Sequence, residues 1–365
     1  MKVCAYCGRH NDEAFTHCSE CGTQFDVEKA PTTGNGEELP ARRSAVIKLD
    51  ELPGSFNFKE GFSRQDWMVI AKAIEGLPGN DSRRLAWDDV TLQWVDKLAG
   101  ELGGGYRVLE AERCLLVSDL EQEAAKRLLH FSTSAIDKIS ESLGGIAWEG
   151  FEGFHVILIL DEEDDYYQYL SAFYSDGEHP KSAGVHIREG LPHIACLYHR
   201  ETTAAQTIVH ELVHHSIHHL PVPTWLHEGL AVTIERIMNS QGPRTLTFDL
   251  PEGHHRFWNE NTIQRFWAGT SFDEPGESNE LSYSLAEVLL HLLAKKRQDF
   301  LAFVRAAHYD DAGQTAALDC LSTCLGEAVG TFLGPGNWRP QRKAIKECWK
   351  AARKRGEGSS DQSDD

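Results

Sequence analysis

Several features that would identify other classes of protein are scarce in this sequence. No run of roughly 18 consecutive apolar residues occurs, so no membrane-spanning helix is expected. The first residues, MKVCAYCG, lack the apolar core of a secretory signal, and nine cysteines in 365 residues are few for a disulfide scaffold. Basic residues number only 36 against 56 acidic ones, a net charge of −20, which argues against an extended nucleic-acid-binding face. The sequence therefore predicts a cytoplasmic protein that does not span a membrane and does not bind nucleic acid.

Four of the cysteines gather near the N-terminus with a regular spacing. Cys4, Cys7, Cys18 and Cys21 form C-x2-C-x10-C-x2-C, and a glycine follows each pair. Each pair offers two thiolates from a tight turn, so the four sulfurs complete the tetrahedral shell of a structural zinc site. Residues 1–25 are predicted to be a zinc ribbon holding one structural zinc ion, with four metal-free cysteines as the alternative. A closed shell has no open position, so no catalysis is assigned to it.

The rest of the chain is predicted to form an α+β body flanked by flexible segments. Residues 26–44 are polar and rich in Gly, Pro and Thr, which is typical of a linker, and residues 351–365 are predicted to be a disordered acidic tail. Residues 45–150 combine helical periodicity with a strand–turn–strand pattern. Residues 151–350 begin with apolar strands, so a small mixed sheet is expected before a mainly helical catalytic part.

A metal-binding pattern stands in the His-rich stretch that follows these strands. His210, Glu211 and His214 form H-E-x-x-H within TIVHELVHH. On a helix, positions four apart lie on one face, so both imidazoles can reach one zinc ion. Glu211, beside the first ligand, is placed to act as a general base toward water. The apolar stripe of this segment predicts a helix that ends at Leu220-Pro221.

A third ligand is needed to distinguish a catalytic zinc site from a solvated His-rich helix. The metzincin pattern fails, because Ile217 and Leu220 stand where that pattern has Gly and His. His218 is excluded as well, because three turns of one straight helix span about 12 Å. Glu228, on a second predicted helix that folds back across the first, completes a His2Glu shell with water in the fourth position.

Two residues of the second helix support this arrangement. Thr224 is a plausible N-cap preceded by Pro223. Gly229 has no side chain and would permit close helix packing beside Glu228.

HELVH followed by PTWLHEGLA resembles the gluzincin metallopeptidases, in particular the group with W-L-x-E-G-L-A after a short turn. The resemblance extends over about residues 105–345 and weakens toward the C-terminus. It implies a gluzincin-like body and a zinc-dependent peptidase. In that enzyme His210, His214 and Glu228 would bind the catalytic zinc, and Glu211 would activate a zinc-bound water for peptide hydrolysis.

The resemblance also implies an oxyanion donor and reveals one departure. Tyr283, in SYSLAEVLL, matches a downstream tyrosine, while His254 and His255 are rival donors and core packing is the other interpretation of Tyr283. Many gluzincins have an acidic residue one turn after the third ligand, where this chain has Val232; Glu235 is the substitute considered.

The sequence leaves alternatives open for the remaining histidines and for the function. His215, His218, His219 and His227 are interpreted as helix surface or as support for the ligands. A peptide or protein is the expected substrate. The alternative function is a degenerate, catalytically weak peptidase fold that binds a protein partner through the zinc ribbon.

Overall fold

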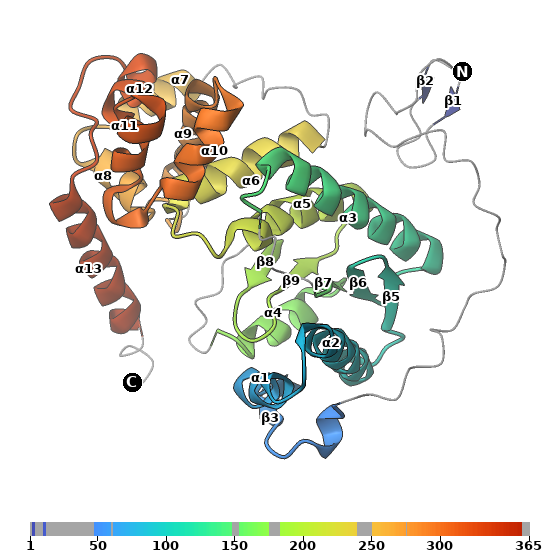
Figure 1. Cartoon of the computed structure of the whole chain (residues 1–365). Helices are drawn as coiled ribbons and strands as arrows, with labels where there is room; N and C mark the ends of the chain where they lie inside the picture. Colours follow the sequence, from blue (N-terminus) through green and yellow to red (C-terminus); the bar gives the residue numbers. More distant parts are fainter. Residues whose placement is uncertain are drawn as a thin grey trace. The chain divides into compact units, whose positions relative to one another are not determined.

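The computed structural model of the chain describes residues 2–3, 10–11, 47–59, 61–147, 153–174, 183–238, 250–274 and 276–359. They combine helices with small sheets, as an α+β protein does (Figure 1). The chain divides into two compact units; one border between them lies at Gly150, and another runs through a single helix after Glu211. The predicted ribbon contributes only the paired strands β1 (Lys2–Val3) and β2 (His10–Asn11) to the description. Its four cysteines and the predicted linker lie outside the described residues.

Unit 1 is built on a mixed five-stranded sheet, which is the sheet expected before the H-E-x-x-H helix. The strand order is β5-β6-β7-β9-β8, with β6, β7 and β9 parallel and the two edge strands antiparallel to their neighbours. The strands are β5 (Arg107–Ala111), β6 (Cys114–Ser118), β7 (His155–Leu160), β8 (Gly184–Ile187) and β9 (His193–Leu197). The three parallel strands are almost wholly apolar and buried, as strands covered on both faces must be.

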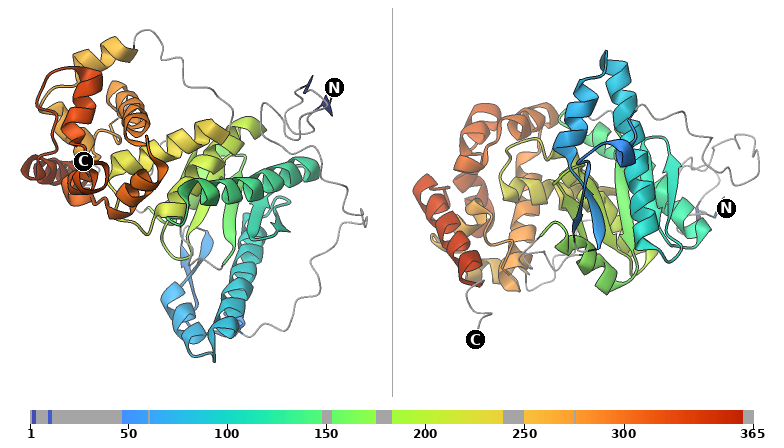
Figure 2. Two further views of the ribbon diagram at one scale, coloured as in Figure 1. Left: turned by 45° about the horizontal axis from the view of Figure 1, so that its top comes forward. Right: turned by 90° about the horizontal axis from the view of Figure 1, so that it is seen from below.

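Helices cover both faces of this sheet (Figure 2). One face packs against α2 (Asn80–Leu102) and α4 (Glu163–Ser171), with α1 (Trp67–Glu75) beside α2. The other face lies under α3 (Gln122–Leu143) and α5 (Glu201–Ile217).

Smaller elements complete unit 1, and its tryptophans belong to its core. The 3-10 turn η1 (Leu49–Glu51) and the hairpin of β3 (Phe56–Lys59) and β4 (Phe62–Gln65) precede α1. Trp94 is buried, and its ring meets that of Trp67 edge-on with centroids 5.6 Å apart, so these side chains pack in the core of the unit.

Unit 2 is helical in its described residues. Indole N–H groups connect distant segments of it: Trp267 donates to the Trp338 carbonyl at 2.8 Å, and Trp349 donates to the Ala268 carbonyl at 2.8 Å. Its elements are α6 (Thr224–Met238), α7 (Leu250–Phe257), α8 (Thr262–Ala268), α9 (Glu277–Leu293), α10 (Arg297–Ala306), η2 (Tyr309–Asp311), α11 (Gln314–Leu321), α12 (Leu325–Leu333) and α13 (Arg342–Ser359).

Three of the C-terminal helices bear on the sequence predictions. Helix α13 continues to Ser359, beyond the predicted start of the tail at residue 351, because its Ala, Lys and Arg residues are strong helix formers. Within the described residues, no single helix has the length and apolarity to cross a membrane. Only α11 and α12 taken together would pass that test, and they are bent by 91°.

Candidate metal centre

Helix α5 places the two motif histidines as the sequence predicts. Its residues Ala204, Ile208 and Leu212 are buried, so the helix has a continuous apolar side. His210 and His214 stand four residues apart in one unbroken helix and therefore project from the same face. Because α5 runs through the border of the two units as a single helix, this spacing is a property of the helix itself.

Helix α6 brings the third predicted ligand to His214. The Glu228 Oε2 atom lies 3.4 Å from His214 Nε2, and both side chains are largely buried. Ligand atoms of His210, His214 and Glu228 all lie within 4.8 Å of one another, so the three residues form a group that could hold a metal ion. The three residues predicted from the sequence as ligands are thus brought together by the fold.

The beginning of α6 is fixed by several contacts within unit 2. The Pro223 carbonyl accepts hydrogen bonds from the amides of Leu226 and His227, so Pro223 holds the cap position and Thr224 is already helical. The predicted N-cap at Thr224 is therefore one residue too late. The prediction relied on side chains that can cap a helix, whereas the first helical hydrogen bond is accepted here by the main-chain carbonyl of Pro223.

Trp225 anchors the same end of the helix. Its fully buried indole donates a hydrogen bond to the Ala312 carbonyl at 3.0 Å. Just before the helix, the Pro221 carbonyl accepts a hydrogen bond from the Tyr309 amide at 2.8 Å. The first turn of α6 is therefore tied to the segment around η2.

Gly229 permits close helix packing, as expected, and the partner that it meets is α9. A Cβ atom at this position would lie 2.7 Å from Leu290 Cδ1 and 3.2 Å from the Ala286 carbonyl oxygen. Both distances are shorter than ordinary contacts, so only glycine fits without a shift. The residue that follows Glu228 thus sets how closely α6 approaches α9.

Glu211 is buried beside the edge strand β8 of unit 1. Only 8% of its surface is exposed. A Cβ atom at Gly184 of β8 would lie 3.3 Å from Glu211 Cγ and 2.2 Å from Thr207 Cγ2, so the glycine lets the helix approach the strand. Burial, with the Glu211 charge as a second cause, raises the pKa of the Cys196 thiol well above its usual range. The side chain of Glu211 therefore lies where α5 approaches β8.

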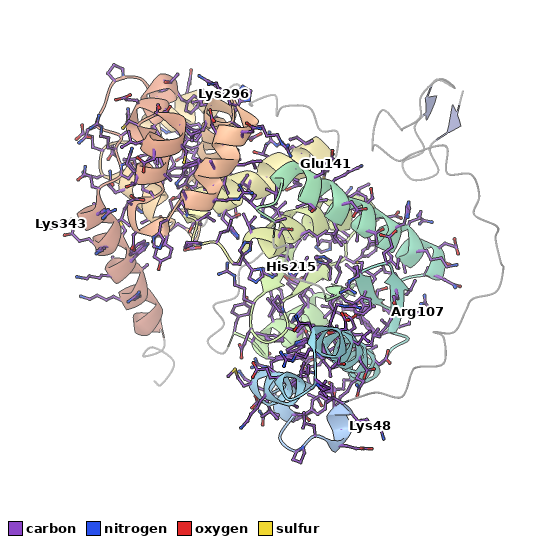
Figure 3. All side chains as sticks on the ribbon, viewed as in Figure 1. Lys48, Arg107, Glu141, His215, Lys296 and Lys343 are labelled. Carbon is purple, nitrogen blue, oxygen red and sulfur yellow. The ribbon has the colours of Figure 1, made fainter. Side chains whose placement is uncertain are left out.

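The additional histidines of the stretch differ in their surroundings. The rings of His214 and His227 are stacked, with centroids 4.3 Å apart and planes 19° apart. His215 is 2% exposed and lies among packed side chains (Figure 3), so a place on the helix surface is wrong for it. The Nδ1–H of His218 donates to the His215 carbonyl at 2.6 Å. The sequence of the stretch does not predict which of its histidines are buried, because burial depends on segments far away in the sequence.

The oxyanion donors considered from the sequence occupy distinct environments. Tyr283 is half-buried on α9, and its ring meets Phe272 edge-on at 5.2 Å; its catalytic role stays a prediction. His254 is fully buried, accepts a hydrogen bond from the Trp258 indole at Nδ1 and contacts Ser284 Oγ through Nε2. Burial lowers the pKa of His254 to about 4. Both of its nitrogens are used in the core, so its role is structural, whereas His255 is exposed.

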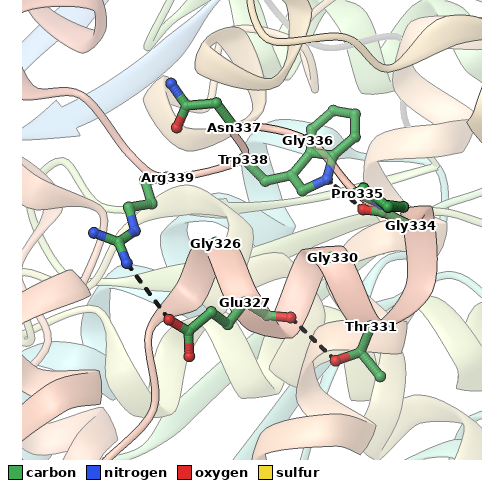
Figure 4. Close-up of a pocket in the computed structure, with 10 residues that line it drawn as sticks. All are labelled: Gly326, Glu327, Gly330, Thr331, Gly334, Pro335, Gly336, Asn337, Trp338 and Arg339. Carbon is green, nitrogen blue, oxygen red and sulfur yellow. Dashed lines mark hydrogen bonds and ion pairs between the residues drawn. The ribbon is translucent and has the colours of Figure 1, made fainter.

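An open pocket of about 530 Å³ lies elsewhere in unit 2 (Figure 4). An ion pair between Glu327 and Arg339, at 3.4 Å, lies on its wall. None of its lining residues belongs to the predicted metal site. They are Gly326, Glu327, Gly330, Thr331, Gly334, Pro335, Gly336, Asn337, Trp338 and Arg339.

Comparison with known proteins adds no identity to this geometry. No protein-family model matches the chain, and no curated protein matches it either.

Proposed function

We propose that the protein is a zinc-dependent metallopeptidase in which His210, His214 and Glu228 hold the metal. The observation that carries the proposal is the 3.4 Å separation of His214 Nε2 and Glu228 Oε2, within a group of three ligand atoms. Metal–ligand bonds of about 2.1 Å in a tetrahedral shell place neighbouring ligand atoms about 3.4 Å apart. Two imidazoles and one carboxylate also match the donor set of catalytic zinc sites that keep one open position. The residues therefore fit a zinc ion.

The proton chemistry falls to Glu211. A bound zinc ion would act as a Lewis acid toward water and a peptide carbonyl. Glu211, next to His210 on α5, would take a proton from the attacking water and pass it to the leaving amine. Its low exposure favours this role, because a carboxylate shielded from bulk water interacts more strongly with nearby charge.

The edge strand β8 offers a place for the substrate backbone. It is the last strand of the sheet, and among the described residues it pairs only with β9. An extended peptide can add to such an edge through main-chain hydrogen bonds. We therefore propose an extended segment of a peptide or unfolded protein as substrate.

The test is the substitution Glu211→Gln in the full-length protein. It removes the base and leaves the three proposed ligands in place. We expect unchanged zinc content and at least about a 100-fold loss in cleavage of an unfolded protein, the usual contribution of general acid–base catalysis. Glu201→Gln is the matched control, because Glu201 begins the same helix and pairs with the exposed Arg127. Equal cleavage by parent and Glu211→Gln would refute the mechanism.

The same experiment separates the alternative function. A parent protein that binds zinc through these ligands but cleaves no unfolded substrate would support a degenerate peptidase fold that binds a protein partner. Val232, where many gluzincins have an acidic residue, is the feature of the chain that favours that outcome.

A further inference from the structure

His227 is one of four histidines of the His-rich stretch to which the proposed mechanism assigns no role. It directly precedes Glu228 on α6, while its ring lies on the ring of His214 from α5. The centroid separation of 4.3 Å and the angle of 19° describe a face-to-face stack of two imidazoles. One side chain thus connects the backbone that carries one proposed ligand with the ring of another.

We propose that His227 is a positioning residue that fixes the ring plane of His214 for metal binding. An imidazole ligand must present a nitrogen along one direction, so rotation of the ring about its side-chain bonds lowers metal affinity. A flat ring stacked on His214 restricts that rotation. In this ring position, His214 Nε2 lies 3.4 Å from Glu228 Oε2, which is the separation expected for two ligands of one zinc ion. The inference rests on the ligand set of the proposed function.

The stacked ring is itself held in place. The His227 amide donates a hydrogen bond to the Pro223 carbonyl at 3.1 Å. Two residues earlier, Trp225 is fully buried and bonded to the Ala312 carbonyl. On the other side, Gly229 lies against α9. Because the backbone around His227 is fixed on both sides, its ring can act as a rigid support rather than follow the motion of His214.

The contacts distinguish this role from that of a fourth ligand. The group of converging ligand atoms contains His210, His214 and Glu228 and does not include His227. The contact of His227 with the site is through its ring face. A phenyl ring can reproduce a face contact and cannot bind a metal ion, so replacement by phenylalanine separates the two roles.

The experiment measures metal affinity in the full-length protein with His227→Ala, His227→Phe and a control, His219→Ala. His219 is an exposed histidine of the same stretch. Zinc affinity is measured by competition with a chelator. Only the zinc that is lost in Glu228→Ala is assigned to this site. Co²⁺ absorption reports the ligand geometry. Thermal unfolding checks that each variant is folded. We expect His227→Ala to bind zinc about tenfold more weakly, as loss of a supporting partner usually does. We expect a changed Co²⁺ spectrum for it, while His227→Phe and His219→Ala resemble the parent.

Two results would overturn the proposal. Parent-like affinity and spectrum in His227→Ala would show that the stack does not position His214. Loss of the site in both His227→Ala and His227→Phe would make His227 a ligand instead. Either result leaves the proposed peptidase open to its own test with Glu211→Gln, whereas a parent with no Glu228-dependent zinc would refute both proposals.

Discussion

The closeness of α6 and α9 at Gly229 allows the position of Glu228 to be tested through packing alone. In Gly229→Ala the new Cβ would lie 2.7 Å from Leu290 Cδ1 and 3.2 Å from the Ala286 carbonyl oxygen. Carbon atoms prefer separations of about 3.5–4.0 Å, so the two helices must move apart by roughly 1 Å or Leu290 must change rotamer. The neighbouring residue is the proposed ligand, so the displacement is transmitted to the metal site.

Two opposing effects set the magnitude. Alanine is favoured over glycine inside a helix by about 1 kcal/mol. Overpacking a filled contact costs about 1–3 kcal/mol. We expect a net loss of about 0–2 kcal/mol in the free energy of unfolding, together with weaker zinc binding, because Glu228 moves away from His214.

Gly253→Ala is the matched control, since it makes the same chemical change in a helix of the same unit. A Cβ there would meet only Leu281 Cδ2 at 3.5 Å and Glu277 Oε1 at 3.9 Å, which are ordinary contacts. The control should be neutral or up to about 1 kcal/mol more stable than the parent. Urea unfolding followed by circular dichroism, with a zinc titration of each variant, measures both effects. If Gly229→Ala matches Gly253→Ala in stability and the parent in zinc affinity, the packing argument is refuted.

Two further predictions concern pH and metal removal. Burial lowers the pKa of His155 and of His193 to about 4, from the ordinary value of 6.5. The unfolded state therefore binds more protons between these values, and the free energy of unfolding should fall as pH drops from about 6.5 to about 4. Urea unfolding across this range should show a smaller fall in His193→Gln, and an identical fall in parent and variant would contradict the assignment. Chelation should leave the far-ultraviolet circular dichroism unchanged but lower the unfolding temperature, because zinc binds the folded state; loss of the helical signal would contradict a preformed site.

Local sequence signals predict the elements around the site and the three side chains that the fold brings together, but not the contacts that fix them. The period of the apolar residues predicts α5, and the apolar run before it predicts β7, because each pattern reports which face of an element is buried. The packing partner of Gly229, in contrast, could not be predicted from a local pattern. Ala286 and Leu290 of α9 lie about sixty residues downstream of Gly229. No local pattern in the sequence indicates that α9 is the helix that packs against α6. The burial of His215 was missed for the same reason.

The contacts around Glu228 bear on what the metal has to do in this fold. The Pro221 carbonyl, the Trp225 indole and Gly229 each join α6 to another segment of unit 2 without using a metal ligand. The position of Glu228 on α6 is thus fixed by packing and hydrogen bonds, so a zinc ion bound there would meet this proposed ligand already in place. The zinc ribbon predicted for residues 1–25 would be the opposite case, because a metal ion would supply most of the stability of so small a unit. In the proposed peptidase, the binding free energy of zinc would therefore not be needed for folding, and it would serve to hold the ion in the geometry that proton transfer by Glu211 requires.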